Sequence, residues 1–221
     1  MADTADVVAV PDSADTFGTK VKQADTILLG FPLGFADKHT SDSLTANDLD
    51  YYGQHTDAAG PAMTWAMFCV GYISLGQETY VSKAAAMFNH SFANVHPPFG
   101  SWMETPSGGT PNFLTGAGGF IQLAYSGYPG LRVNDTHMSL KPLLPSGLTN
   151  IKLRGVAYKG SRLDIAYSTT VSITLLAEAR SATAKQPPIL ELVAAGGERQ
   201  KMTPGSTITL KSLVPFSITE A

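Results

Sequence analysis

Glu104 is the residue of this sequence that is best placed to do chemistry. It follows Trp102 by two positions, inside a glycine- and proline-rich segment that runs over residues 97–119. A carboxylate can take or give a proton, and an indole can stack on the apolar face of a bound molecule. Such a composition is typical of an active-site loop. One carboxylate is seldom a whole active site, however, and Glu104 could equally be a solvated loop residue and Trp102 a packing residue.

The histidines and the cysteine predict no metal site and no cofactor. Cys69, the single cysteine, lies in an apolar run, where a small buried side chain is a simpler interpretation than a reactive thiol. The histidines lack the i, i+4 spacing with which two imidazoles on one helix bind zinc. They are His39, His55, His90, His96 and His137.

The composition is that of a globular protein without a surface for nucleic acid or a segment for a membrane. Of the 221 residues, 43% are hydrophobic and 15% are charged, and the formal net charge is -3. Nucleic-acid binding needs clustered positive charge, and no run of lysine or arginine occurs. No apolar stretch reaches the roughly 18 residues of a transmembrane helix. No secretory signal is visible at the N-terminus, so we expect a cytoplasmic protein.

Hydrophobic periodicity predicts helices in the first half of the chain. Residues 1–19 have little periodicity and predict a loose lead-in. The clearest helix covers residues 62–75, because Pro61 occupies a turn that tolerates proline and Gly76 stands where a C-cap is favoured. Residues 78–94 are interpreted as its hairpin partner. Three shorter helices are expected over residues 21–31, 47–52 and 112–127, with a loop over residues 34–47.

The pattern changes to short alternating runs near residue 130. These runs are separated by turn residues, including Lys159-Gly160, and are typical of an antiparallel β-sandwich. The predicted strands cover residues 131–134, 137–140, 151–158, 162–167, 171–176, 189–193 and 206–210. The sequence therefore predicts a helical domain over residues 20–130 and a β-sandwich domain over residues 131–221.

Several segments, taken in order, resemble motifs of a known family. They are Lys22-Gln-Ala-Asp-Thr-Ile-Leu-Leu-Gly-Phe-Pro, Asp48-Leu-Asp-Tyr-Tyr, Gly60-Pro-Ala-Met-Thr-Trp, Pro98-Phe with Trp102-Met-Glu, Asn112-Phe-Leu-Thr-Gly-Ala-Gly-Gly-Phe-Ile-Gln and Gly130-Leu-Arg-Val. Over roughly residues 20 to 180 the chain is similar to the C-terminal part of glycoside hydrolase family 65.

The resemblance implies a fold in which an (α/α)6 barrel is followed by a small β domain. Such a barrel has more helices than this sequence predicts. The resemblance therefore implies that residues 20–130 are the last helices of the barrel, and that the N-terminal part of the barrel would be a partner. Helices that close a barrel would leave large apolar faces exposed when they stand alone.

The resemblance also implies an activity, which is the hydrolysis of glucose from a disaccharide unit by an inverting α-glucosidase. Glucosyl-galactosyl-hydroxylysine is the expected substrate, and trehalose is the alternative. The disaccharide phosphorylases of the family carry serine and histidine where this chain has Pro61-Ala-Met-Thr and Leu114-Thr-Gly-Ala. Because those residues bind phosphate, their replacement favours attack by water.

The family pattern assigns roles to five residues here. Glu104 corresponds to the general base, and Lys22 and Gln23 to a pair that hydrogen-bonds glucose. Trp102 would be a platform for the sugar, and the backbone around Thr115 would hold a hydroxyl or the attacking water. The family's general acid lies in a Pro-Asp-Glu-Tyr-like motif that this sequence lacks.

Two functions therefore remain open. The chain could be the C-terminal part of an α-glucosidase that lacks the general acid and is inactive alone. It could instead be a non-catalytic module that binds carbohydrate or another protein and keeps half of a sugar site.

Overall fold

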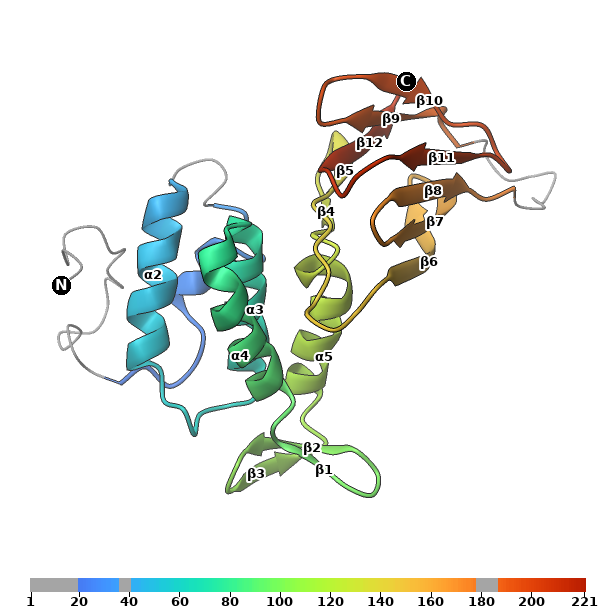
Figure 1. Ribbon diagram of the computed structural model, residues 1–221. Coiled ribbons are helices and arrows are strands. Elements are labelled where there is room, and N and C mark those ends of the chain that lie inside the picture. The colour runs from blue at the N-terminus through green and yellow to red at the C-terminus, as the bar shows by residue number, and fades with distance from the viewer. Residues whose placement is uncertain (1–19, 36–40, 178–186) are drawn as a thin grey trace. The chain divides into compact units, whose positions relative to one another are not determined.

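The computed structural model describes residues 20–35, 41–177 and 187–221. These residues form two compact units, which divide between Gly127 and Tyr128 (Figure 1). The first unit contains the helices and a small sheet, and the second contains two larger antiparallel sheets. The predicted order of helices followed by antiparallel strands is therefore confirmed. The lead-in predicted for residues 1–19 lies outside the described residues.

Local capping explains two of the helix ends in the first unit. They are the 3-10 turn η2 (Thr26–Leu29), α2 (Asp42–His55), α3 (Met63–Leu75), the 3-10 turn η3 (Glu78–Tyr80), α4 (Val81–Ser91), α5 (Leu114–Gln122) and the π-helical turn η4 (Leu123–Gly127). The Ser41 hydroxyl accepts a hydrogen bond from the Leu44 N–H at 3.2 Å and caps α2. Gly76 ends α3 in the left-handed conformation, with φ 67°.

Helix α3 is the centre of the helical unit. It packs against α2, α4 and α5. Its side chains are apolar on nearly every side and almost all are buried, as expected for a helix with neighbours on several faces. Phe68 is fully buried and Trp65 nearly so. A Cβ at Gly71 would lie 2.6 Å from the Leu49 side chain, so the glycine lets α2 approach α3 closely.

The outer face of α5 is apolar and exposed. Leu114 and Ile121, which share one face at the i and i+7 positions, are 82% and 58% exposed. Tyr125 in η4 is also exposed. This exposure agrees with the expectation that the helices leave apolar surface open, although Trp65 and Phe68 on α3 are buried. No helix among the described residues is long and apolar enough to cross a membrane.

A small antiparallel sheet occupies much of the segment that the sequence predicted to be a loop. Its strands are β1 (Val95–His96), β2 (Ser101–Thr105) and β3 (Gly108–Pro111), in the order β1-β2-β3. Gly108 and Gly109 follow the β2–β3 turn with φ of 136° and 85°. The glycines that suggested a loop thus begin the second strand of a hairpin, where glycine tolerates the positive φ.

The second unit is built from two antiparallel sheets. One has the order β10-β9-β12-β5-β4 and the other β11-β8-β7-β6. The strands are β4 (Arg132–Val133), β5 (His137–Leu140), β6 (Ile151–Tyr158), β7 (Ser161–Tyr167), β8 (Val171–Leu175), β9 (Leu190–Ala194), β10 (Arg199–Lys201), β11 (Thr207–Leu210) and β12 (Phe216–Glu220). Lys159 and Gly160 form the predicted β6–β7 turn, with φ of 45° and 79°.

The two sheets share one hydrophobic core, which is the arrangement of a sandwich. Alternate residues of β7 and β8 point inward, among them Leu163, Ile165 and Ile173. From the other sheet, Met138 on β5 and Ile218 on β12 enter the same core. All five side chains have no exposed surface, so the inward face of each sheet is fully covered.

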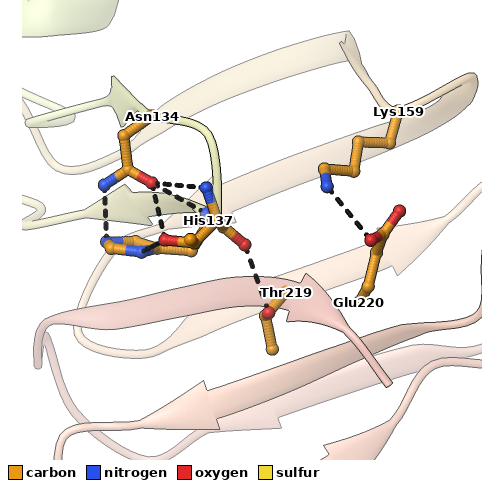
Figure 2. Close-up of polar contacts among 6 residues, drawn as sticks. Asn134, His137, Lys159, Thr219 and Glu220 are labelled. Carbon is orange, nitrogen blue, oxygen red and sulfur yellow. Dashed lines mark hydrogen bonds and ion pairs between the residues drawn. The ribbon is translucent and has the colours of Figure 1, made fainter.

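Polar contacts connect the β4–β5 and β6–β7 turns to the end of strand β12 (Figure 2). The Asn134 Oδ1 accepts hydrogen bonds from the backbone N–H groups of Thr136 and His137, each at 2.9 Å, and so shapes the β4–β5 turn. The Thr219 hydroxyl donates to the carbonyl of Thr136 at 3.3 Å. Lys159 pairs with Glu220 at 3.2 Å and links the β6–β7 turn to the end of β12.

Gly130 is held where no side chain fits. Its φ is 63°, and a Cβ there would lie 2.6 Å from the backbone oxygen of Lys141. Gly130→Ala is therefore expected to destabilise the β unit by more than the roughly 1–2 kcal/mol that a left-handed alanine costs alone. Gly147→Ala is the matched control, because Gly147 also has a positive φ but has open space around it. Urea unfolding followed through the amide resonances of β5 and β12 measures both, and equal losses would contradict the steric argument.

Three further departures from the predicted elements each have a physical reason. The helix expected over residues 21–31 is only η2, because Val21 pairs with Thr56 in a parallel bridge at the end of α2. Helix α2 begins at Asp42 rather than after a loop to residue 47, because Ser41 provides the cap. Strands β10 and β12 were not predicted, since both are short and lie beside proline or glycine.

Candidate functional site

The backbone of Glu104 is fixed by the helical unit. Its carbonyl oxygen accepts a hydrogen bond from the N–H of Ala62 at 2.8 Å, just before α3 begins. The Asn94 side-chain amide also donates to it, at 3.4 Å. Next to it, the Met103 N–H donates to the Asn94 carbonyl at 3.0 Å. Strand β2 is therefore anchored to the start of α3 and to the segment that follows α4.

The carboxylate of Glu104 is held by the next strand. Its Oε2 accepts a hydrogen bond from the backbone N–H of Thr110 at 3.1 Å, and the Thr110 hydroxyl donates to the carboxylate as well. These two hydrogen bonds, with a smaller contribution from the positive charge of Lys22, hold the pKa of Glu104 below its usual value. Glu104 therefore stays ionised at neutral pH and can accept a proton.

Lys22 is close enough to Glu104 for its positive charge to lower the pKa of that carboxylate, although the two are far apart in the sequence. The segment that carries Lys22 is fixed by hydrogen bonds of 2.8 Å from the Val21 N–H to the His55 carbonyl and from the Asp57 N–H to the Val21 carbonyl. A Cβ at Gly60 would lie 2.4 Å from the carbonyl oxygen of Lys22. The glycine before α3 thus allows the Lys22 backbone to pack directly against this end of the helical unit.

Trp102, on strand β2 of the same hairpin, packs against the start of α5. Its carbonyl accepts a hydrogen bond from the Phe113 N–H at 2.8 Å, and its ring lies 5.4 Å from that of Phe120, centre to centre. A Cβ at Gly116 would come within 3.1 Å of the indole. The indole Nε1 is buried and has no hydrogen-bond partner among the described residues. Trp102 therefore has a clear packing role, and the residue as a whole is partly exposed.

The two remaining predicted residues are exposed. Gln23 follows Lys22 at the surface, and Thr115 lies in the first turn of α5. Neither has a hydrogen bond to Glu104 in the described part of the chain. The structure thus brings Glu104 and Lys22 together and leaves Gln23 and Thr115 at the surface of the same unit.

Sequence reasoning missed Gly109 and Thr110, which hold the carboxylate. A Cβ at Gly109 would lie 2.9 Å from both the Cβ and the Oε2 of Glu104, so the glutamate side chain lies across the glycine. The available signal was the Gly-Gly-Thr sequence after a short turn, which places these residues opposite Glu104 if the segment is a hairpin rather than a loop. Among the described residues, no cluster of histidine, cysteine and acidic side chains is suited to a metal ion.

Comparison with known proteins gives a consistent set of relatives. Residues 131–185 match the family model described as glycosyl hydrolase family 65, C-terminal domain. The chain is 39% identical to the protein-glucosylgalactosylhydroxylysine glucosidase of Danio rerio over 193 residues, which are 87% of this chain and 28% of that protein. It is 33% identical to the cell wall acid trehalase of Arthroderma benhamiae, over 89% of this chain and 19% of the relative. The chain thus spans less than a third of the length of these relatives.

The fold also resembles that of a solved structure. It matches a "Putative kojibiose phosphorylase from human microbiome" with a TM-score of 0.59 and 14% sequence identity. The match covers 86% of this chain and 23% of that one. At this level of identity the likeness shows a shared fold and carries no information on activity.

Proposed function

We propose that this chain, which belongs to glycoside hydrolase family 65, forms one side of the catalytic site of an inverting α-glucosidase. The observation that carries the proposal is the ionised carboxylate of Glu104, held by Thr110 and close enough to Lys22 for that charge to lower its pKa. The relatives support it, because they are named as hydrolases of glucosylated or disaccharide substrates.

Glu104 is proposed as the general base. In inverting hydrolysis, a base removes a proton from water while an acid, about 6.5–9.5 Å away, protonates the leaving oxygen. An ionised carboxylate can perform the first step, and the lowered pKa of Glu104 keeps it ionised. The family's acid-bearing motif does not occur in this sequence. The chain alone is therefore expected to be inactive, and the acid would come from the N-terminal part of the barrel.

The helices of the first unit are proposed to be the last helices of an (α/α)6 barrel. The exposed apolar face of α5 at Leu114 and Ile121 supports this, since neighbouring helices would cover such a face. The β unit would then be the C-terminal domain, in keeping with the family match over residues 131–185. A cytoplasmic location stays a prediction.

The proposed ligand is a glucose-containing sugar. The names of the relatives favour a unit such as glucosyl-galactosyl-hydroxylysine, with trehalose as the alternative. Lys22 and Gln23 would hydrogen-bond the glucose hydroxyls, and the Trp102 ring would contact the apolar face of the sugar. Thr115, at the start of α5, would lie beside backbone N–H groups that could hold a hydroxyl or the attacking water.

A non-catalytic carbohydrate-binding or interaction module is the second candidate. The absence of the acid-bearing motif from the sequence favours it, because Lys22 and Glu104 could bind a sugar without cleaving it. Both candidates need a sugar site around Lys22, so this site is tested first.

Glucose binding to the purified chain tests the sugar site. Lys22→Gln is expected to weaken binding roughly tenfold or more, because a hydrogen bond from a charged group contributes about 1.5–3 kcal/mol and 1.4 kcal/mol is a factor of ten. Lys83→Gln is the matched control, since Lys83 pairs with Asp50 at 2.6 Å and has no proposed role in the site. Calorimetric titration or ligand-observed NMR measures both. No binding by the unsubstituted chain, or an equal loss in both variants, would contradict the proposal.

A further inference from the structure

We propose that Thr110 is the positioning residue of Glu104: with Gly109 it forms a seat that fixes the direction of the carboxylate. This inference rests on the proposed role of Glu104 as a general base. Thr110 would not touch the substrate itself and would act through Glu104.

The seat is made by an irregularity in the β2–β3 pairing. Met103 pairs with Pro111 and Thr105 pairs with Gly108, with a shift in register between them. One residue of β2, Glu104, therefore stands opposite two residues of β3, Gly109 and Thr110. This is the count of a β-bulge, a feature that re-aims side chains and recurs beside active sites.

The bulge gives the carboxylate both space and donors. Gly109 lacks the Cβ that would lie 2.9 Å from the Glu104 Oε2, so the side chain can cross the strand there. Thr110 then offers its backbone N–H at 3.1 Å and its hydroxyl. Two donors from one residue of a paired strand restrict a side chain that would otherwise sample many rotamers at a surface position.

Fixing the carboxylate matters more for orientation than for basicity. Hydrogen bonds to the ionised form favour that form, so the pKa of Glu104 is lowered and the carboxylate becomes a weaker base. The same hydrogen bonds keep the Glu104 carboxylate ionised near neutral pH and hold it in one direction. A base must lie within hydrogen-bond reach of its water, so a fixed direction favours the reaction.

Titration of Glu104 by carbon NMR in the 221-residue chain tests the seat without any sugar. In the unsubstituted chain the Glu104 pKa is expected to lie below that of an ordinary glutamate. It should move upward in Thr110→Val, which keeps the shape and loses the hydroxyl, and should return in Thr110→Ser. Thr105→Val is the matched control, because the Thr105 hydroxyl bonds the Gly108 carbonyl in the same hairpin and not the carboxylate. An ordinary pKa in the unsubstituted chain, or an equal shift in Thr105→Val, would overturn the proposal.

A second measurement needs no change at Thr110. The amide proton of Thr110 should shift with pH at the same midpoint as the Glu104 carboxylate, and this dependence should vanish in Glu104→Gln. A Thr110 amide that does not respond to the titration would overturn the proposal even if Thr110→Val does not fold. Because no sugar is present, a failed sugar site leaves this result unaffected, and the two proposals can fail separately.

Discussion

Replacing Glu104 by glutamine is expected to lower sugar hydrolysis by at least about 100-fold when the rest of the proposed barrel is supplied in trans. The partner to co-express is the part of the Danio rerio relative that lies outside the matched 28% of its length. A general base contributes about 10² to 10⁴ in rate, and glutamine keeps the shape of glutamate but cannot take the proton. Release of glucose from glucosyl-galactosyl-hydroxylysine, with trehalose in parallel, measures the effect.

Glu78→Gln is the matched control for this experiment, because Glu78 is an exposed glutamate in η3 of the same unit. Full activity of the Glu104→Gln pair, or an equal loss in Glu78→Gln, would contradict the assignment of the base. Hydrolysis by the 221-residue chain alone would contradict the proposal that the acid lies elsewhere. An inactive pair whose 221-residue chain still binds glucose would favour the non-catalytic module.

Replacing Phe68 by alanine is expected to destabilise the helical unit by about 3–5 kcal/mol, the usual cost of deleting a buried phenylalanine side chain. Phe68 has no exposed surface and lies at the centre of α3, 6.1 Å from the ring of Trp65. The two tryptophans of the chain, Trp65 and Trp102, both belong to the helical unit. Tryptophan fluorescence during urea unfolding therefore reports on this unit and not on the β unit.

Phe99→Ala is the matched control, since Phe99 lies between β1 and β2 and is 94% exposed. Surface substitutions usually change stability by no more than about 0.5 kcal/mol. A small effect of Phe68→Ala would show that the core around α3 is loosely packed. If Phe99→Ala destabilises the unit as much as Phe68→Ala does, Phe99 is buried in solution. Its contacts would then differ from those in this structure.

The elements that could be predicted are those whose residues carry a local reason for their structure. Helix α3 is apolar for its whole length, follows a proline and ends at Gly76, so its bounds follow from propensity and capping. The β6–β7 hairpin has alternating residues on both sides of Lys159-Gly160, and its turn was found at that position.

The elements that could not be predicted depend on contacts with distant residues. The helix expected over residues 21–31 was lost because the backbone of Val21 pairs with the end of α2, which no local pattern reveals. The sequence predicts a loop at strand β2 because Trp102 and Glu104 lie among glycines and prolines. Its pairing with β3, and its anchor on the N–H of Ala62, are tertiary contacts.

In the candidate site, too, some residues carry a local signal in the sequence and others depend on tertiary contacts. Glu104 and Trp102 could be singled out from residue type and family motif, and Lys22 from the family motif alone. Thr110 and Gly109 were missed because their role depends on the register of a hairpin. A hydrogen-bond donor supplied by the backbone leaves no residue type to recognise in a sequence.

Strand β12 sets a limit on when the β unit can fold during synthesis. It lies in the interior of the five-stranded sheet, between β9 and β5, although it comes after both of them in the chain. A ribosome adds roughly 5–20 residues per second, so β5 waits on the order of seconds for this partner. Until Phe216–Glu220 emerges, β5 and β9 each present an unpaired edge to solvent or to a chaperone. During that time Met138 and Leu140 also lack their cross-strand neighbours on β12, Ile218 and Phe216.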